Sequence, residues 1–204
     1  MTGTAKKALA FEFSGSHLNA FVSDKMEYIN IMNAEYPSIL PRSFHSRHPV
    51  SVARDLLGKL LIRRIDNHTM MSVVITETEA YGPPSEDPLV KTEGVRGLRL
   101  DWEPGLAWTT YAMRGRPTLN ITAMTPSCVL IRAIEPKEEW ILSDVSLTRL
   151  TVGPINLART LKIDRSLDKT DVTVSGPLFI CGGKSVAADD IVESKRKNVK
   201  IDTE

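Results

Sequence analysis

The stretch "VVITETEAYGPP", Val73 to Pro84, combines a strand-like apolar pattern with two carboxylates and a turn. Successive side chains of a strand point to opposite faces of its sheet. The pattern therefore places four side chains on one face: Val73, Ile75, Glu77 and Glu79. Carboxylates are rarely buried in a folded protein unless they are paired or take part in its function. The end of this strand is therefore a candidate functional site.

Other segments supply neighbours for this strand. Four of them have the apolar and β-branched composition that is typical of strands: residues 59–65, 106–113, 118–124 and 127–136. The turn "DNHT" joins the first of these to residues 70–81 as an antiparallel pair, and "RGRP" joins the second and third as a hairpin. Pro136 is expected to end the fourth, because proline cannot donate a hydrogen bond to a ladder.

Two segments carry clear helical signals, and a third is also predicted to be helical. In "SVARDLLGK", residues 51–59, Ser51 is the expected N-cap. The inner face of this helix comprises Val52, Leu56 and Leu57. In "GPINLARTL", residues 153–161, Pro154 occupies the first helical position, where its fixed φ is favourable. The third segment is residues 138–150.

The chain of 204 residues is long enough for one well-packed domain and short for two. We expect residues 1–40 to form an N-terminal extension and residues 41–204 to form the domain. Within the extension, residues 19–32 fit one amphipathic helix. Residues 82–107 are rich in glycine, proline and charge, which predicts a long functional loop.

Composition excludes several classes of protein. A hydrophobic content of 42% and a charged content of 25% are typical of soluble globular proteins. The formal net charge of +1 neither indicates nor excludes a nucleic-acid partner. Cys128 and Cys181 fit no zinc-ligand spacing, which favours buried thiols, a reducing compartment and no metal site. The sequence contains no apolar run of about 18 residues, so no membrane association is expected.

Arg132, like the two glutamates, is a charged residue on a predicted strand face that is otherwise apolar. Its predicted strand face also holds three apolar residues, Cys128, Leu130 and Ile134. A buried guanidinium is costly without a carboxylate partner, so we expect Arg132 to pair with Glu77 or Glu79. Such a pair is either a structural ion pair at the end of a sheet or a carboxylate that orients and deprotonates a water molecule.

Six sequence blocks resemble the alkyladenine (3-methyladenine) DNA glycosylase family in order and spacing. They are "SVARDLLGKLLIRRI", "VVITETEAYG", "EPGLAW", "LNI", "CVLIRAIEP" and "GPINLARTLKIDRSL", and the resemblance covers roughly residues 40–171. It implies a single α+β domain with a curved, mostly antiparallel sheet flanked by helices. It also implies a monofunctional hydrolase of base excision repair that works without a cofactor. The expected partner is double-stranded DNA containing damaged bases. The expected protein is a monomer, in the cytoplasm (nucleoid) of a prokaryote or the nucleus of a eukaryote.

The resemblance also implies roles for individual residues. Glu79 matches the general base for the attacking water, and Arg132 matches the arginine that positions this water. Tyr81 matches one wall of the aromatic sandwich around an extruded purine, and Asn120 matches the asparagine that screens the edge of the base. The intercalating residue of the hairpin falls at Met113, which is still a usable apolar wedge. The expected phosphate-binding side chains beside it are Arg114 and Arg116.

Some positions depart from the family pattern. Lys91 stands where the pocket histidine is expected, and Thr110 stands at the second stacking tyrosine. Asn156 replaces a lysine that would contact a phosphate, and the chain stops near "KNVKIDTE", before the family's closing segment. A lysine at 91 could also attack the abasic sugar as a lyase does. Two alternatives therefore stay open: a catalytically weak nucleic-acid-binding protein that keeps the fold, and an unrelated acid-dependent hydrolase.

Overall fold

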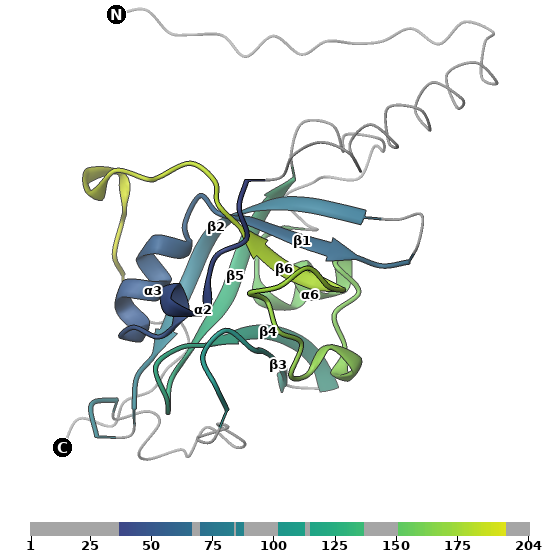
Figure 1. Ribbon diagram of the computed structural model, residues 1–204, viewed down its shortest axis with the longest axis horizontal. Coiled ribbons are helices and arrows are strands. Elements are labelled where there is room, and N and C mark those ends of the chain that lie inside the picture. The colour runs from purple at the N-terminus through teal and green to yellow at the C-terminus, as the bar shows by residue number, and fades with distance from the viewer. Residues whose placement is uncertain are drawn as a thin grey trace, which may run out of the picture. The chain divides into compact units, whose positions relative to one another are not determined.

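Six strands form one antiparallel sheet in the order β3-β4-β5-β2-β1-β6 in the computed structural model (Figure 1). The structure describes residues 37–66, 70–83, 85–87, 102–112, 115–136 and 151–194. The strands are β1 Leu60–Arg64, β2 Met70–Tyr81, β3 Ala107–Ala112, β4 Arg116–Thr122, β5 Cys128–Pro136 and β6 Leu178–Cys181. The helices are α2 Arg42–His45, α3 Pro49–Leu56 and α6 Pro154–Thr160, with 3-10 turns η3 Arg165–Leu167 and η4 Ala188–Asp190.

Local turns produce the two pairs of strands that the sequence predicts. β1 pairs with β2, and β3 pairs with β4 so that Ala112 lies opposite Arg116 at the end of the hairpin. Gly115 has a φ of 66°, a left-handed conformation that glycine adopts without steric cost. β5 lies between β4 and β2, which is a non-local arrangement. β6 is absent from the strands that the pattern predicts, although all four of its residues are buried.

Helix α3 begins earlier than the sequence predicts. Its first residue is Pro49 and its N-cap is His48, so the expected Ser51 cap is wrong. Proline at the first helical position has a suitable φ and lacks only an N–H that would have no helical partner, which makes Pro49 the better start. The inner face is confirmed for Val52 and Leu56, which are fully buried.

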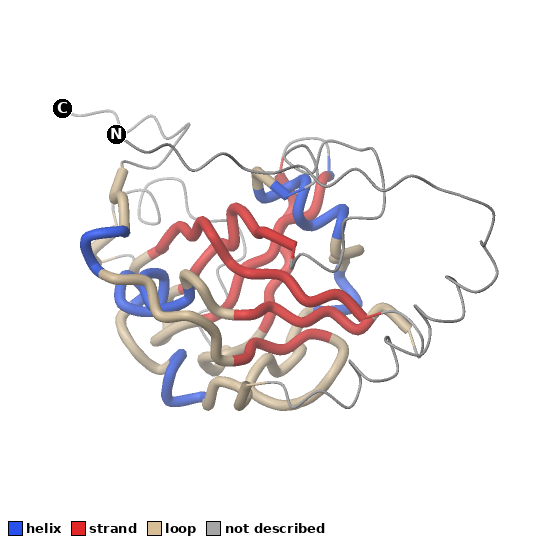
Figure 2. Tube along the Cα trace, turned by 90° about the horizontal axis from the view of Figure 1, so that it is seen from above, coloured by secondary structure: helices blue, strands red, loops and turns tan. Residues whose placement is uncertain are grey.

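Both longer helices pack into the main hydrophobic core. α3 contacts β2 and β5, and α6 contacts β4 and β5 (Figure 2). Buried residues of α6, including Leu157, belong to the same core as Leu56 of α3 and Ile131 of β5. The α+β class with a curved antiparallel sheet and flanking helices is therefore confirmed. In the described part of the chain, no helix is both long and apolar enough to cross a membrane.

Several predictions fall where the structure gives no description. The predicted helices at residues 19–32 and 138–150 lie outside the described residues. Most of the predicted loop at residues 82–107 does as well. Residues 82–83, 85–87 and 102–106 are described, and Ala107 already belongs to β3. The boundary between an extension at 1–40 and a domain stays a prediction.

Candidate active site

An irregular register in the β2–β5 pair decides where the two glutamates point. Shifts occur between Ile75 and Glu77 and between Glu77 and Thr78. Before this irregularity Ile75 belongs to the main core, and after it Ala80 packs against that core. Glu79, which alternates with Ala80, therefore points away from the core. The prediction of one face for all four side chains is wrong, because an irregular strand breaks the two-residue alternation.

The same change of face occurs on β5. Ile131 and Ile134 both belong to the main core although they are three residues apart, so the alternation breaks between them. Cys128 lies in a separate, smaller cluster on the other side of the strand. Arg132 therefore shares its face with Cys128 and Leu130, as predicted, whereas the prediction for Ile134 is wrong. On both strands, the face that points toward the core changes at the irregular part of the β2–β5 pair.

Arg132 is bonded to both glutamates, as the sequence suggests for at least one. Its Nε donates to Glu77 Oε1 at 2.9 Å, and its Nη1 donates to Glu79 Oε2 at 2.5 Å. The Glu79 side chain is 9% exposed, that of Arg132 15% and that of Glu77 40%. Burial lowers the pKa of Arg132, but attraction to Glu79 and the hydrogen bond to Glu77 outweigh this effect and raise it overall. The guanidinium therefore stays charged.

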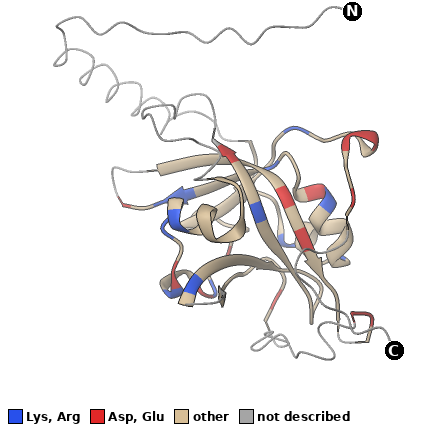
Figure 3. Ribbon diagram, turned by 180° about the vertical axis from the view of Figure 1, so that it is seen from behind, with Lys and Arg blue, Asp and Glu red and all other residues tan. Residues whose placement is uncertain are grey.

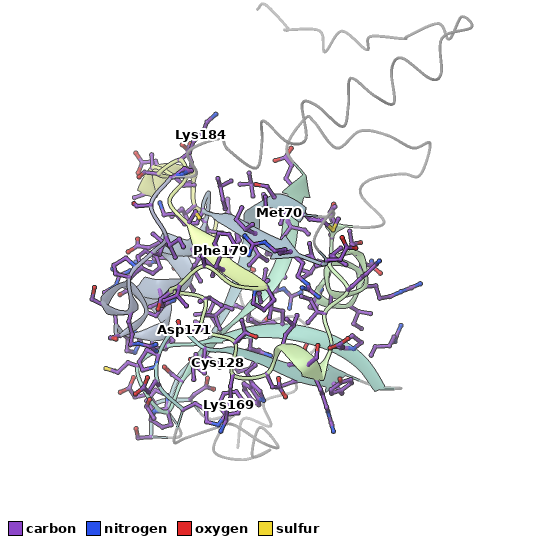
Figure 4. The ribbon with its side chains drawn as sticks, turned by 45° about the vertical axis from the view of Figure 1, so that its right-hand side comes forward. Met70, Cys128, Lys169, Asp171, Phe179 and Lys184 are labelled. Carbon is purple, nitrogen blue, oxygen red and sulfur yellow. The ribbon has the colours of Figure 1, made fainter. Side chains whose placement is uncertain are left out.

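Tyr81 completes the environment of Glu79. Its hydroxyl donates to Glu79 Oε1 at 2.5 Å, so each oxygen of this carboxylate accepts a hydrogen bond from a different side chain. The Tyr81 ring packs against a small cluster that contains Trp102, Trp108 and Cys128. Lys169, labelled in Figure 4, lies next to this cluster, with its Nζ 5.2 Å from the centre of the Trp102 ring. Tyr81 thus joins the carboxylate to an aromatic region.

Strand register brings Asn120 to the same face as Glu79. Trp108 lies opposite Asn120, Asn120 opposite Leu130, and Leu130 opposite Glu79, so the four residues form one row across β3, β4, β5 and β2. Opposite residues of neighbouring strands point to the same face, and each strand spacing adds about 4.8 Å. Asn120 and Glu79 are therefore separated by about 10 Å of sheet on one surface.

Thr110 holds the side chain of Asn120 in place. The Asn120 amide nitrogen donates to Thr110 Oγ1 at 3.0 Å and to the Trp108 carbonyl at 3.2 Å. Thr110 Oγ1 also lies 2.5 Å from Thr118 Oγ1. A threonine at this position therefore acts as a hydrogen-bonding partner of the asparagine rather than as an aromatic wall.

The structure describes two of the other five predicted site residues, Arg116 and Asn156. Arg116 is exposed at the start of β4, and Asn156 lies in the first turn of α6, where its amide donates to the Val152 carbonyl. Lys91, Met113 and Arg114 lie outside the described residues. The base-pocket role of Lys91 and the DNA-binding roles of the other four positions stay predictions.

A cavity of about 760 Å³ lies beside the glutamates, between α3, β2 and the segment 184–194. Four further charged residues line this cavity: Arg54, Lys184, Asp190 and Glu193. Sequence reasoning does not identify them as part of the site, because they come from distant parts of the chain. Figure 3 shows acidic residues on β2 beside a basic residue on β5. Within the described part of the chain, no group of three metal-ligand side chains occurs.

Sequence comparisons place this chain in a known class of protein. The chain is similar to three proteins named as candidate 3-methyladenine DNA glycosylases. The protein from Salinibacter ruber is 34% identical over 180 residues, covering 77% of this chain and 85% of the relative. That from Methanocella arvoryzae is 33% identical over 159 residues, covering 72% and 79%. That from Aeropyrum pernix is 37% identical over 144 residues, covering 68% and 70%.

These relatives and the site define a DNA glycosylase, a hydrolase of DNA repair that acts on N-glycosidic bonds. The sequence pattern of the methylpurine-DNA glycosylase family matches residues 43–204. The chain belongs to this family.

Proposed function

We propose that the protein extrudes an alkylated or deaminated purine from duplex DNA and hydrolyses its N-glycosidic bond with a water molecule activated by Glu79. The observation that carries this proposal is the environment of the Glu79 carboxylate. This group is almost fully buried, bonded on one oxygen to Arg132 and on the other to the Tyr81 hydroxyl. A carboxylate fixed in this way is suited to accept a proton in a defined direction.

The proposed step follows from the capacity of this carboxylate. Two carboxylate oxygens offer about four acceptor sites, so the two observed bonds leave capacity for a water molecule. The water oxygen forms a bond to C1′ of the deoxyribose, and its proton passes to Glu79. The C1′–N bond breaks, and its electron pair leaves with the purine. An alkylated, cationic purine leaves as the neutral base, whereas a deaminated purine leaves as an anion that takes up a proton from solvent. The second product is an abasic sugar with a hydroxyl group at C1′. The charge of Arg132 balances that of Glu79 before the proton is transferred.

Extrusion is required because the C1′–N bond is not accessible to a side chain inside a stacked duplex. In the proposed complex, the Tyr81 ring covers one face of the purine and Asn120 contacts its edge. Alkylation at N3 or N7 makes a purine cationic, and an aromatic face attracts a cation. The surface between Glu79 and Asn120 supports this arrangement, since both side chains lie on one face of the sheet.

Base release from duplex DNA tests the proposal. We expect the wild-type protein in excess to release purine from a methylated or hypoxanthine-containing duplex, and Glu79→Gln to lower the rate by about 100-fold or more, because general-base catalysis contributes about 10²–10⁴-fold. Chromatography of the released base gives the rate, and a filter-binding assay on the same duplex gives the affinity. Equal rates for both proteins would contradict the role of Glu79.

One observation favours a second candidate function, a weakly catalytic protein that binds DNA through the same fold. Thr110 occupies the expected position of a second stacking aromatic and is instead bonded to Asn120 and Thr118. A pocket with one aromatic wall fewer holds an extruded base less firmly. This alternative gives salt-dependent binding of the duplex without turnover. The same two assays separate it from the proposed hydrolase.

A further inference from the structure

Glu77 contacts the charged pair of the candidate active site but has no part in the proton transfer described above. Its carboxylate accepts from Arg132 Nε at 2.9 Å, whereas Glu79 accepts from Arg132 Nη1. The two contacts use different N–H groups of one planar guanidinium. Glu77 is also more exposed than Glu79, 40% against 9%, so it lies further from the buried part of the site.

Two contacts constrain an arginine more than one contact does. A guanidinium that is held through Nη1 alone can still rotate and tilt about that bond, because the arginine side chain has many rotamers. A second hydrogen bond at Nε fixes the plane of the group and its direction. The register shifts of β2 lie on either side of Glu77, and such irregularities re-aim side chains next to active sites.

We infer that Glu77 is a positioning residue for hydrolysis: it holds the Arg132 guanidinium so that Nη1 stays on Glu79. This inference rests on the proposed function. Glu77 acts through Arg132, which in turn fixes the orientation of the carboxylate that takes the proton. The contrasting explanation is an ordinary ion pair at a sheet surface, which contributes little to stability and nothing to the rate.

The chain offers a matched control for that explanation. Asp55 of α3 accepts from Arg47 Nη1 at 2.7 Å, and both side chains are partly exposed, at 51% and 38%. Asp55 does not line the cavity beside the glutamates. Replacing Asp55 by alanine therefore removes a comparable Arg–carboxylate pair away from the site.

The first test compares Glu77→Ala, Glu77→Gln and Asp55→Ala in single-turnover base release with protein in excess. We expect Glu77→Ala to lower the rate at saturation by about 10-fold or more, with unchanged affinity for the duplex, because a misplacement of about 1 Å in a reacting group can cost up to about 10²-fold in rate. Glu77→Gln should recover much of this loss, because its amide oxygen can still accept from Nε. Asp55→Ala should match the wild type. Thermal melting confirms that each variant is folded.

The second test asks whether Glu77 acts through Arg132. In an Arg132→Lys background the side chain has no Nε donor, so adding Glu77→Ala should cause no further loss of rate. An equal loss in both backgrounds, or a Glu77→Ala protein as fast as the wild type, overturns the inference. These results are distinct from failure of the proposed function, in which the wild-type protein itself releases no base.

Discussion

At the scale of single residues, the buried histidine of α2 has an unusual environment. His45 is fully buried, and neither ring nitrogen has a hydrogen-bond partner among the described residues. Burial above all, together with the charges of Arg47 and Arg42 and against the opposing charge of Asp171, lowers its pKa to about 4. The imidazole is therefore neutral in the folded protein at neutral pH, at a position where protonation is unfavourable.

This environment leads to a prediction about acid stability. A folded-state pKa of about 4, against an ordinary value of 6.5, means that the unfolded chain binds the proton more readily. The stability contributed by neutral His45 is complete above pH 6.5 and is lost as the pH falls toward 4, by an amount that reaches roughly 3 kcal/mol. Urea unfolding at pH 7 and pH 5 measures this loss.

The variant His45→Leu should make stability less dependent on pH in this window, because leucine is apolar, close in volume and does not titrate. The control is His48→Gln, since the His48 side chain is 43% exposed and pairs with Glu86 at the surface. A His45→Leu protein that loses as much stability between pH 7 and pH 5 as the wild type does would contradict the assignment.

At this scale, the sequence predicts which side chains pair with each other better than it predicts the face of the sheet on which they lie. The pairing of Arg132 with the glutamates follows from the cost of burying charge and is confirmed. The face on which they lie does not follow, because the irregularity at Glu77 is a property of two paired strands. The bond from Tyr81 to Glu79 links positions two residues apart, yet only the three-dimensional arrangement shows that the hydroxyl reaches the carboxylate.

At the scale of elements, the segment after β6 meets the end of α3 at very close range. A Cβ atom on Gly183 would lie 2.2 Å from the carbonyl oxygen of Gly58, and one on Gly58 would lie 2.4 Å from the carbonyl oxygen of Lys184. Real Cβ atoms do not approach backbone atoms so closely. The two glycines therefore permit a backbone contact that places residues 184–194 beside the cavity.

We expect Gly183→Ala to destabilise the fold by about 1–3 kcal/mol, because the added methyl group must displace backbone rather than a flexible side chain. Urea unfolding at pH 7 measures the change. The matched control is Gly176→Ala, where the nearest atom to an added Cβ is 4.0 Å away and a much smaller effect follows. Equal stabilities of the two variants would show that the chain relaxes around residue 183 at little cost.

The same scale shows what local patterns can predict. Hairpins β1–β2 and β3–β4 are confirmed because short turns bring neighbouring strands together. Helix α6 begins at Pro154 as predicted, since proline at the first position is a local signal. The contact between residues 58 and 183 has no such signal. Each glycine is required only because the other segment approaches it closely in the folded chain.

At the scale of the whole molecule, the order of strands creates the candidate site. β5 lies between β4 and β2, and this non-local pairing places Leu130 between Asn120 and Glu79. No turn encodes that order, so the apolar patterns of the strands leave it undetermined. The resemblance to a known family names the residues in advance, while the sheet shows that Glu79, Arg132 and Asn120 share one surface.

The charge of the whole chain limits how it can bind DNA. A formal net charge of +1 provides little general attraction to a polyanion, so affinity must come from individual cations at the contact surface. Arg116 is exposed at the start of β4, next to the turn of the β3–β4 hairpin. Arg64 is an arginine of β1, three strands away from β4 in the sheet, and serves as the matched control.

If Arg116 contacts a phosphate, Arg116→Ala should weaken binding of damaged and undamaged duplexes by the same factor, because a phosphate contact carries no information about the base. It should also reduce the slope of log K against log salt concentration by about 1, the expected change for one lost contact. Fluorescence anisotropy between 50 and 200 mM salt, about the range in which such contacts dominate, measures both quantities. Arg64→Ala removes the same charge from the chain and should leave the slope unchanged. Equal slopes for both variants would show that net charge, and not the hairpin, determines the affinity.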